Sequence, residues 1–138
     1  PARRRSGVLR GECEGGMIIL RFQDRSGRGP FRPGIPAMWS DAEGASPPAV
    51  FERFPAFMSN LERIHAAGGY VGCAWLGWDG LDRYFTQTEQ ARMHALGYRV
   101  HRVPNSTVLM SDGDEAVFVS WRPLKALPRA HRKQGGSW

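Results

Sequence analysis

Three short strand patterns near the end of the chain limit its fold more than any other feature. They cover Tyr98–Val103, Thr107–Met110 and Glu115–Trp121, separated only by turn signals at Asn105-Ser106 and Asp112-Gly113-Asp114. A parallel sheet needs a long crossover between successive strands, and this region has none. We therefore expect an α+β fold with a small mixed or antiparallel β-sheet and two to four short helices, in a single domain over residues 17–127.

Two further strands are expected earlier in the chain. Met17–Gln23 alternates, with Leu20 and Phe22 on one face and Arg21 and Gln23 on the other. Tyr70–Leu76 is an apolar run suited to a buried strand. These two segments supply the remaining strands of the predicted sheet.

The helices are expected between these strands. Ser46-Pro47-Pro48 carries the signals of a helix start, and Pro55 should kink or split the helix that follows. A second helix would bury one face, formed by Trp78, Leu81 and Phe85. Thr86-Gln-Thr-Glu89 matches a capping box, so a further helix should begin there and end at Gly97. The capping box also explains Glu89 better than a catalytic role does.

The most distinctive segment is the loop Asp24–Trp39, which contains three prolines and three glycines and is expected to be irregular. Its central part, GRGPFRPG at residues 27–34, suits an anion-binding loop. Arg28 and Arg32 would supply guanidinium groups and Phe31 a stacking face. The alternative is a compact surface loop held by Phe31 and Trp39. The loop has neither the spacing of a P-loop nor that of a dinucleotide fingerprint.

The chain is basic, with 19 Lys+Arg against 13 Asp+Glu and a net charge of +6 over 138 residues. All of these cations except Lys125 and Lys133 are arginines, which suit phosphate and carboxylate ligands. The charge favours an anionic partner: a nucleotide, a nucleic acid or an acidic host-protein surface. The alternative is the codon bias of a GC-rich genome. Residues 1–16 and 128–138 are expected to be basic flexible tails, and Met17 is a candidate for the natural start.

Several classes of protein are not favoured by the sequence. Cys13 and Cys73 are the only cysteines, and a structural disulfide between a tail and a strand is not expected. No apolar run is long enough for a membrane span, so we expect a cytoplasmic protein without a membrane partner. The four histidines have no metal-ligand spacing, so no metal site is expected. Trp75, Trp78 and Trp121 are expected in the core or along a pocket.

Two charged residues in strands are candidates for function. Arg21 lies in an apolar strand, where a guanidinium should meet an anionic ligand or a carboxylate such as Asp24. Glu115 opens the last strand, where a carboxylate can project into a cleft and stabilise a developing positive charge. The alternatives are a structural ion pair for Arg21 and a turn residue for Glu115.

The stretches RFQDRSGRGPFRPG, GGYVGCAW, YFTQTEQARMHALGY and EAVFVSWRPL resemble a group of small phage and prophage proteins over residues 17–124. The element order also resembles a minimal ADP-ribosyltransferase fold. Such folds carry an Arg or His on the first strand that holds the dinucleotide, and a Glu or Gln on a late strand that contacts the nicotinamide ribose. A hydroxyl or aromatic residue stands on a middle strand.

This resemblance implies a set of site residues. Arg21 and Glu115 would be catalytic, and Trp75 or Tyr70 would line the nicotinamide site. The NAD-binding set would be Arg21, Gln23, Arg28, Phe31, Arg32 and Trp75. Leu76-Gly77-Trp78 stands where the family has a Ser or Thr, which departs from its pattern.

Three functions follow from these observations. The first is a phage-type effector that binds NAD or another nucleotide and transfers ADP-ribose to a host macromolecule. The second is a non-enzymatic basic protein that docks on nucleic acid or on a host defence complex as an inhibitor. The third is a phage accessory or structural protein. The basic tails favour the second function, and the internal Arg21 and Glu115 favour the first.

Overall fold

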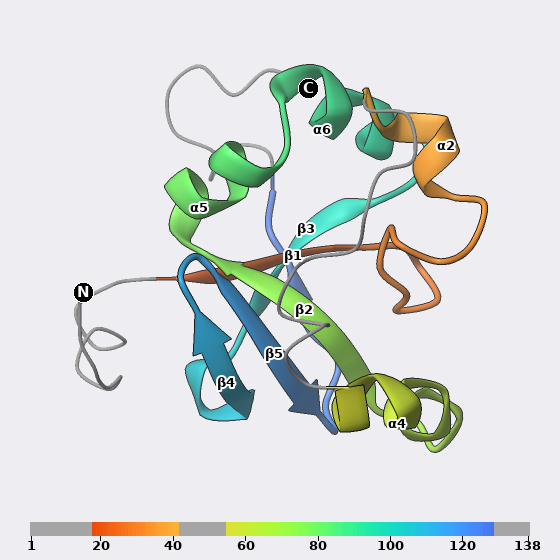
Figure 1. Cartoon of the computed structure of the whole chain (residues 1–138), viewed down its shortest axis with the longest axis vertical. Coiled ribbons are helices and arrows are strands. Elements are labelled where there is room, and N and C mark those ends of the chain that lie inside the picture. The colour runs from red at the N-terminus through yellow and green to blue at the C-terminus, as the bar shows by residue number, and fades with distance from the viewer. Residues whose placement is uncertain (1–17, 42–54, 129–138) are drawn as a thin grey trace.

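A single antiparallel sheet forms the centre of the molecule, and its first strand lies inside the sheet (Figure 1). The computed structural model describes residues 18–41 and 55–128. Every paired strand runs antiparallel to its neighbour, and the order across the sheet is β4-β5-β2-β1-β3-β6. The expectation of a small α+β domain is confirmed. The strands are β1 (Ile19–Gln23), β2 (Tyr70–Leu76), β3 (Arg99–Val103), β4 (Val108–Asp112), β5 (Glu115–Ser120) and β6 (Lys125–Ala126).

The described helices form two groups around the sheet. Figure 1 shows α5, α6 and α2 above β1, from its left end to its right, and α4 at the lower right, by the start of β2. A 3-10 turn at Asn105–Thr107 precedes β4. No helix of the described ranges is long and apolar enough to cross a membrane. The helices are α2 (Pro36–Trp39), α4 (Pro55–Ala66), α5 (Gly77–Tyr84) and α6 (Gln87–Ala95).

The structure differs from the expected elements at two places, and a third expectation falls outside the described residues. The loop after β1 is not wholly irregular, because α2 begins at Pro36, where the fixed φ of proline suits a first helical turn. The strand β6 was missed, since two residues give no periodic pattern. The expected helix start at Ser46-Pro47-Pro48 lies outside the described residues, and α4 is described from Pro55 onward.

The alternation predicted for the first strand is confirmed, because successive residues of β1, which is buried on both faces, enter different core clusters. Leu20 and Phe22 belong to the larger core cluster, with Trp75 and Phe85, whereas Ile19 belongs to a second cluster with Val103 and Phe118. The expectation that Trp121 lies in the core or a pocket is wrong. Its side chain is 62% exposed, because β5 ends one residue earlier.

The capping box of α6 is present in full. The Thr86 amide donates to Glu89 Oε1 at 3.0 Å, and the Glu89 amide donates to Thr86 Oγ1 at 3.0 Å. The second carboxylate oxygen of Glu89 accepts a hydrogen bond from the Asp41 amide at 2.8 Å. Glu89 therefore completes the cap at the start of α6 and also holds the segment that follows α2 against that helix.

Candidate functional site

The buried side chain of Arg21 lies between β1 and β2 where the pairing of these two central strands ends, and the candidate site lies beside it. The strands β1 and β2 pair only at Ile19–Leu76 and Leu20–Trp75. At the next residue of β1, the side chain of Arg21 donates from Nη1 to the Cys73 carbonyl at 3.2 Å and from Nη2 to the Val71 carbonyl at 3.3 Å. The guanidinium thus gives two carbonyls of β2 the donors that a continued ladder would supply.

The remaining partners of Arg21 are also uncharged. Nε donates to Gln23 Oε1 at 2.9 Å and Nη2 to the Gly27 carbonyl at 3.4 Å, while Cζ lies 5.2 Å from the centre of the Phe118 ring. Burial lowers the pKa of Arg21 to about 10, so the group stays charged at neutral pH. The expectation that Arg21 meets a carboxylate is wrong, because every described acceptor is neutral and Asp24 pairs with Arg32 instead.

Two glycines leave the space that this guanidinium occupies. A Cβ atom built on Gly72 would overlap Nη1 of Arg21 and lie 3.1 Å from its Cζ. A Cβ on Gly29 would lie 3.2 Å from the same Nη1 atom. Gly72 also has φ of 151°, a conformation that side-chain-bearing residues rarely adopt. The strand β2 and the loop after β1 therefore both carry a glycine where Arg21 passes between them.

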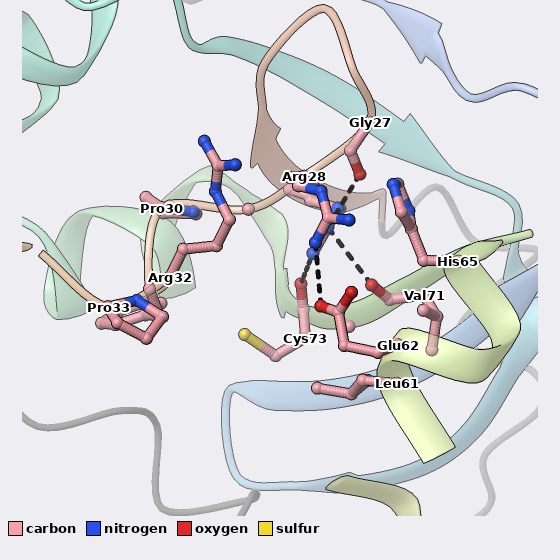
Figure 2. A pocket seen from close by; sticks show the side chains of 14 residues that line it. Gly27, Arg28, Pro30, Arg32, Pro33, Leu61, Glu62, His65, Val71 and Cys73 are labelled. Carbon is pink, nitrogen blue, oxygen red and sulfur yellow. Dashed lines mark hydrogen bonds and ion pairs between the residues drawn. The ribbon is translucent and has the colours of Figure 1, made fainter. Parts of the chain in front are cut away.

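A cavity of about 210 Å³ opens beside the guanidinium. In Figure 2, loop residues such as Arg28 and Pro30 form one side, and Leu61, Glu62 and His65 of α4 form the other. The strand β2 supplies the floor. The lining residues are Arg21, Gly27, Arg28, Gly29, Pro30, Phe31, Arg32, Pro33, Leu61, Glu62, His65, Val71, Gly72 and Cys73.

The cavity combines three guanidinium groups with two nearby carboxylates. Arg28 Nη1 lies 2.8 Å from Glu62 Oε2, and this hydrogen bond holds the pKa of the Glu62 carboxyl below its usual value. Arg32 Nη2 lies 3.3 Å from Asp24 Oδ2. Nε of Arg32 is buried without a hydrogen-bond partner in the described structure. The site therefore holds guanidinium donors that the protein itself does not fully use.

Asp24 shapes the loop that carries these arginines. Its Oδ1 atom accepts hydrogen bonds from the Ser26 hydroxyl at 2.7 Å and from the Ser26 and Arg28 amides at 2.9 and 3.0 Å. Partial burial raises the pKa of Asp24, but these hydrogen bonds and the charge of Arg32 outweigh it, and the net shift is downward. An ionised Asp24 is thus part of the loop structure.

A second hollow of about 280 Å³ lies beyond the aromatic core. Trp75 and Tyr84 line it with Glu115, and Arg83 pairs with Asp114 at its edge at 2.8 and 3.0 Å. Nε1 of the fully buried Trp75 has no hydrogen-bond partner in the described structure. Burial, with nearby negative charge, raises the pKa of Tyr84.

The structure divides the predicted site residues between these two hollows. The first cavity is lined by Arg21, Arg28, Phe31 and Arg32. Gln23 does not line it, but its Oε1 atom accepts the hydrogen bond from Nε of Arg21. Trp75 and Glu115 line the second hollow, as direct partners across β2 and β5.

Arg21 and Glu115 are not brought into one site. Leu20 pairs with Trp75, which pairs with Glu115, so these three residues share one face of the sheet. Arg21 follows Leu20 and therefore starts from the opposite face. Three packed aromatic rings lie between the two hollows. The centre of the Phe31 ring lies 6.1 Å from that of Tyr84, and the centre of the Tyr84 ring lies 5.2 Å from that of Trp75.

Sequence reasoning missed Glu62, Tyr84 and Gly72 as site residues. Glu62 is an exposed helix residue whose partner lies 34 positions away, and no local pattern marks such a pair. Gly72 interrupts an apolar strand, and a glycine inside a strand pattern signals a close approach of another group. That signal was present in the sequence.

Comparison with known proteins adds no assignment, since no family model, curated protein or solved structure matches the chain. The described residues contain no group of three or more His, Cys, Asp or Glu side chains that could hold a metal ion. The site must therefore be interpreted from its own chemistry.

Proposed function

We propose that the protein binds NAD or another nucleotide at the arginine-lined cavity, as an effector with an ADP-ribosyltransferase-like fold. The observation that carries the proposal is the group of guanidinium donors at the cavity, above all the buried and unpartnered Nε of Arg32. Such planar donors suit the oxygen atoms of a phosphate. Phe31 and the prolines of the loop add apolar surface against which a base or ribose can pack.

The sizes of the hollows bear on which nucleotide fits. The cavity of about 210 Å³ and the hollow of about 280 Å³ are each below the roughly 300–1,000 Å³ typical of small-molecule sites. The first cavity alone is therefore small for a whole dinucleotide and suits a smaller phosphate-bearing ligand better. A dinucleotide would have to pass the contact between Phe31 and Tyr84 and use both hollows.

Glu115 is the residue that would take part in the transfer of ADP-ribose. With the pyrophosphate near Arg28 and Arg32, the nicotinamide end would have to extend past the Phe31–Tyr84 contact into the hollow that Glu115 lines with Trp75 and Tyr84. Transfer breaks the bond between the nicotinamide nitrogen and the ribose carbon, nicotinamide leaves, and the acceptor bonds to that carbon and loses a proton. A carboxylate beside the ribose stabilises the positive charge that develops on it.

The first test is binding, measured as the rise in melting temperature of the full chain when NAD, ADP or nicotinamide is added. A ligand that binds only the folded state raises the melting temperature with the logarithm of its concentration. We expect a saturable rise with NAD that the Arg28→Gln, Arg32→Gln double variant loses. Arg92→Gln is the matched control, because Arg92 also pairs with a carboxylate but lines neither hollow.

The second test separates binding from turnover. Glu115→Gln should keep most of the NAD-dependent rise in melting temperature while release of nicotinamide falls by about 100-fold or more, as for loss of one stabilising group in a transition state. If millimolar NAD and ADP leave the melting temperature unchanged, the nucleotide site is refuted. If NAD binds and nicotinamide is never released, only the binding part stands.

A further inference from the structure

Three basic side chains remain unpaired near the β3–β6 edge of the sheet. Arg102 of β3 and Lys125 of β6 lie directly opposite each other, and both are exposed. Arg122, three residues before Lys125, is exposed as well. The structure describes no ion pair or side-chain hydrogen bond for any of the three, whereas Arg28, Arg32, Arg83 and Arg92 each pair with a carboxylate.

Two like charges opposite each other across neighbouring strands are unfavourable in the protein alone. The repulsion between Arg102 and Lys125 would be relieved by an anion that contacts both side chains. These residues line neither of the two hollows described above, and all three side chains are exposed. An extended polyanion that lies along an open surface fits this arrangement.

An exposed aromatic residue adjoins this charge. Trp121 directly precedes Arg122, and 62% of its side chain is exposed. The bend is fixed by Ser120, whose hydroxyl donates to the Arg122 carbonyl at 2.7 Å and accepts from the Arg122 amide at 3.2 Å. Leu124 is buried with Ile19 and holds the following residues against the sheet. Trp121 and Arg122 therefore lie on an anchored segment that leads to Lys125, and one edge of the Trp121 ring lies beside Gly69, just before β2.

We propose that this surface, defined as Arg102, Trp121, Arg122 and Lys125, binds single-stranded nucleic acid. Phosphates meet the three cations, and a base stacks on Trp121, a combination that binds single strands with little sequence preference. In the sequence, Arg129, Arg132 and Lys133 follow closely after β6 and add positive charge to the same end of the chain. The inference is independent of the nucleotide site and names a different partner.

The test is fluorescence anisotropy of the full chain with a labelled 12-nucleotide DNA of mixed sequence, titrated at several salt concentrations. Arg102→Gln, Lys125→Gln should weaken binding on the order of 20-fold at 0.1 M salt and reduce the log–log salt slope by about 1.4. The control, Arg25→Gln, Arg92→Gln, removes the same charge from two exposed arginines, on the loop after β1 and on α6, and should change affinity by less than about threefold.

Two further measurements keep the outcome unambiguous. Trp121→Ala should weaken binding by about tenfold, which a purely electrostatic surface would not show. The melting temperature of Arg102→Gln, Lys125→Gln should not fall, because the change removes a repulsion, so lost binding cannot be attributed to unfolding.

Some results would overturn the proposal. Equal losses in the two double variants would mean that net charge alone attracts the DNA. Equal competition by polyglutamate or by anionic vesicles would point to an acidic protein or a membrane surface instead. No binding of single-stranded DNA or of the matching RNA at low salt would refute it outright.

Discussion

Substitution of Gly72 by alanine tests the structural reading of Arg21 most directly. The new Cβ would overlap Nη1 of Arg21, so the guanidinium would have to move away from Gly72 toward the adjoining cavity. Arg21 would have to leave its place between β1 and β2. The carbonyls of Val71 and Cys73 would then lose their charged donor.

The expected loss can be worked out from these contacts. Two hydrogen bonds from a charged donor are worth about 1.5–3 kcal/mol each, and the strained backbone at a φ of 151° adds about 1 kcal/mol. The sum is about 4–7 kcal/mol, which is comparable to the whole stability of a typical domain, about 5–15 kcal/mol. Gly72→Ala should therefore lose a large part of its free energy of unfolding at 25 °C.

Gly97→Ala is the control, because Gly97 also has a positive φ, of 102°, but open space where its Cβ would be. It should cost only about 1–2 kcal/mol of backbone strain. The free energy of unfolding is measured by urea titration followed by circular dichroism. In an Arg21→Met background the cost of Gly72→Ala should shrink toward that of the control, since the group it collides with is gone. Equal costs for Gly72→Ala and Gly97→Ala in the parent chain would refute the reasoning.

Three smaller predictions follow from the same structure. Thr86→Ala should lower the free energy of unfolding by about 1 kcal/mol through loss of the α6 cap, as urea titration would show. Burial raises the pKa of the Cys73 thiol to about 12, so in a Cys13→Ser background Ellman's reagent at pH 8 should label no thiol until the protein is unfolded. The lowered pKa of Asp24 adds stability that is complete above about pH 4 and is lost as the pH falls through the folded-state pKa. Asp24→Asn should thus lose less stability than the parent between pH 7 and pH 3.

The fold was predictable wherever the pattern was local. The close spacing of the last strands gave the antiparallel sheet, and the capping box gave the start of α6, because both signals lie within a few residues. The strand β6 was missed because its two residues are held by pairing with β3 alone. Trp121 was misplaced because an aromatic in phase with a strand gives no sign that the strand has already ended.

The site was predictable in its parts and not in its assembly. The loop arginines and Phe31 were identified from composition, and they do line one cavity. That Glu115 belongs to a different hollow follows from the register of β1, β2 and β5, which a single sequence does not contain. The neutral partners of Arg21 were equally hidden, because backbone carbonyls carry no residue identity.

Arg21 has a consequence for how a nucleotide site here should be tested. Its guanidinium holds β1 and β2 together where their ladder stops, and the cavity opens at that break. A variant of Arg21 would remove the cavity wall and the sheet contact at once, so lost binding in that variant would not identify a ligand contact. Arg28 and Arg32 are more exposed and bond to single carboxylates rather than to the sheet, so their removal leaves the break intact. If Arg28→Gln, Arg32→Gln bound a nucleotide as tightly as the parent chain, the two loop arginines would not be ligand contacts, and the arginine-lined cavity as proposed would be refuted as the phosphate site.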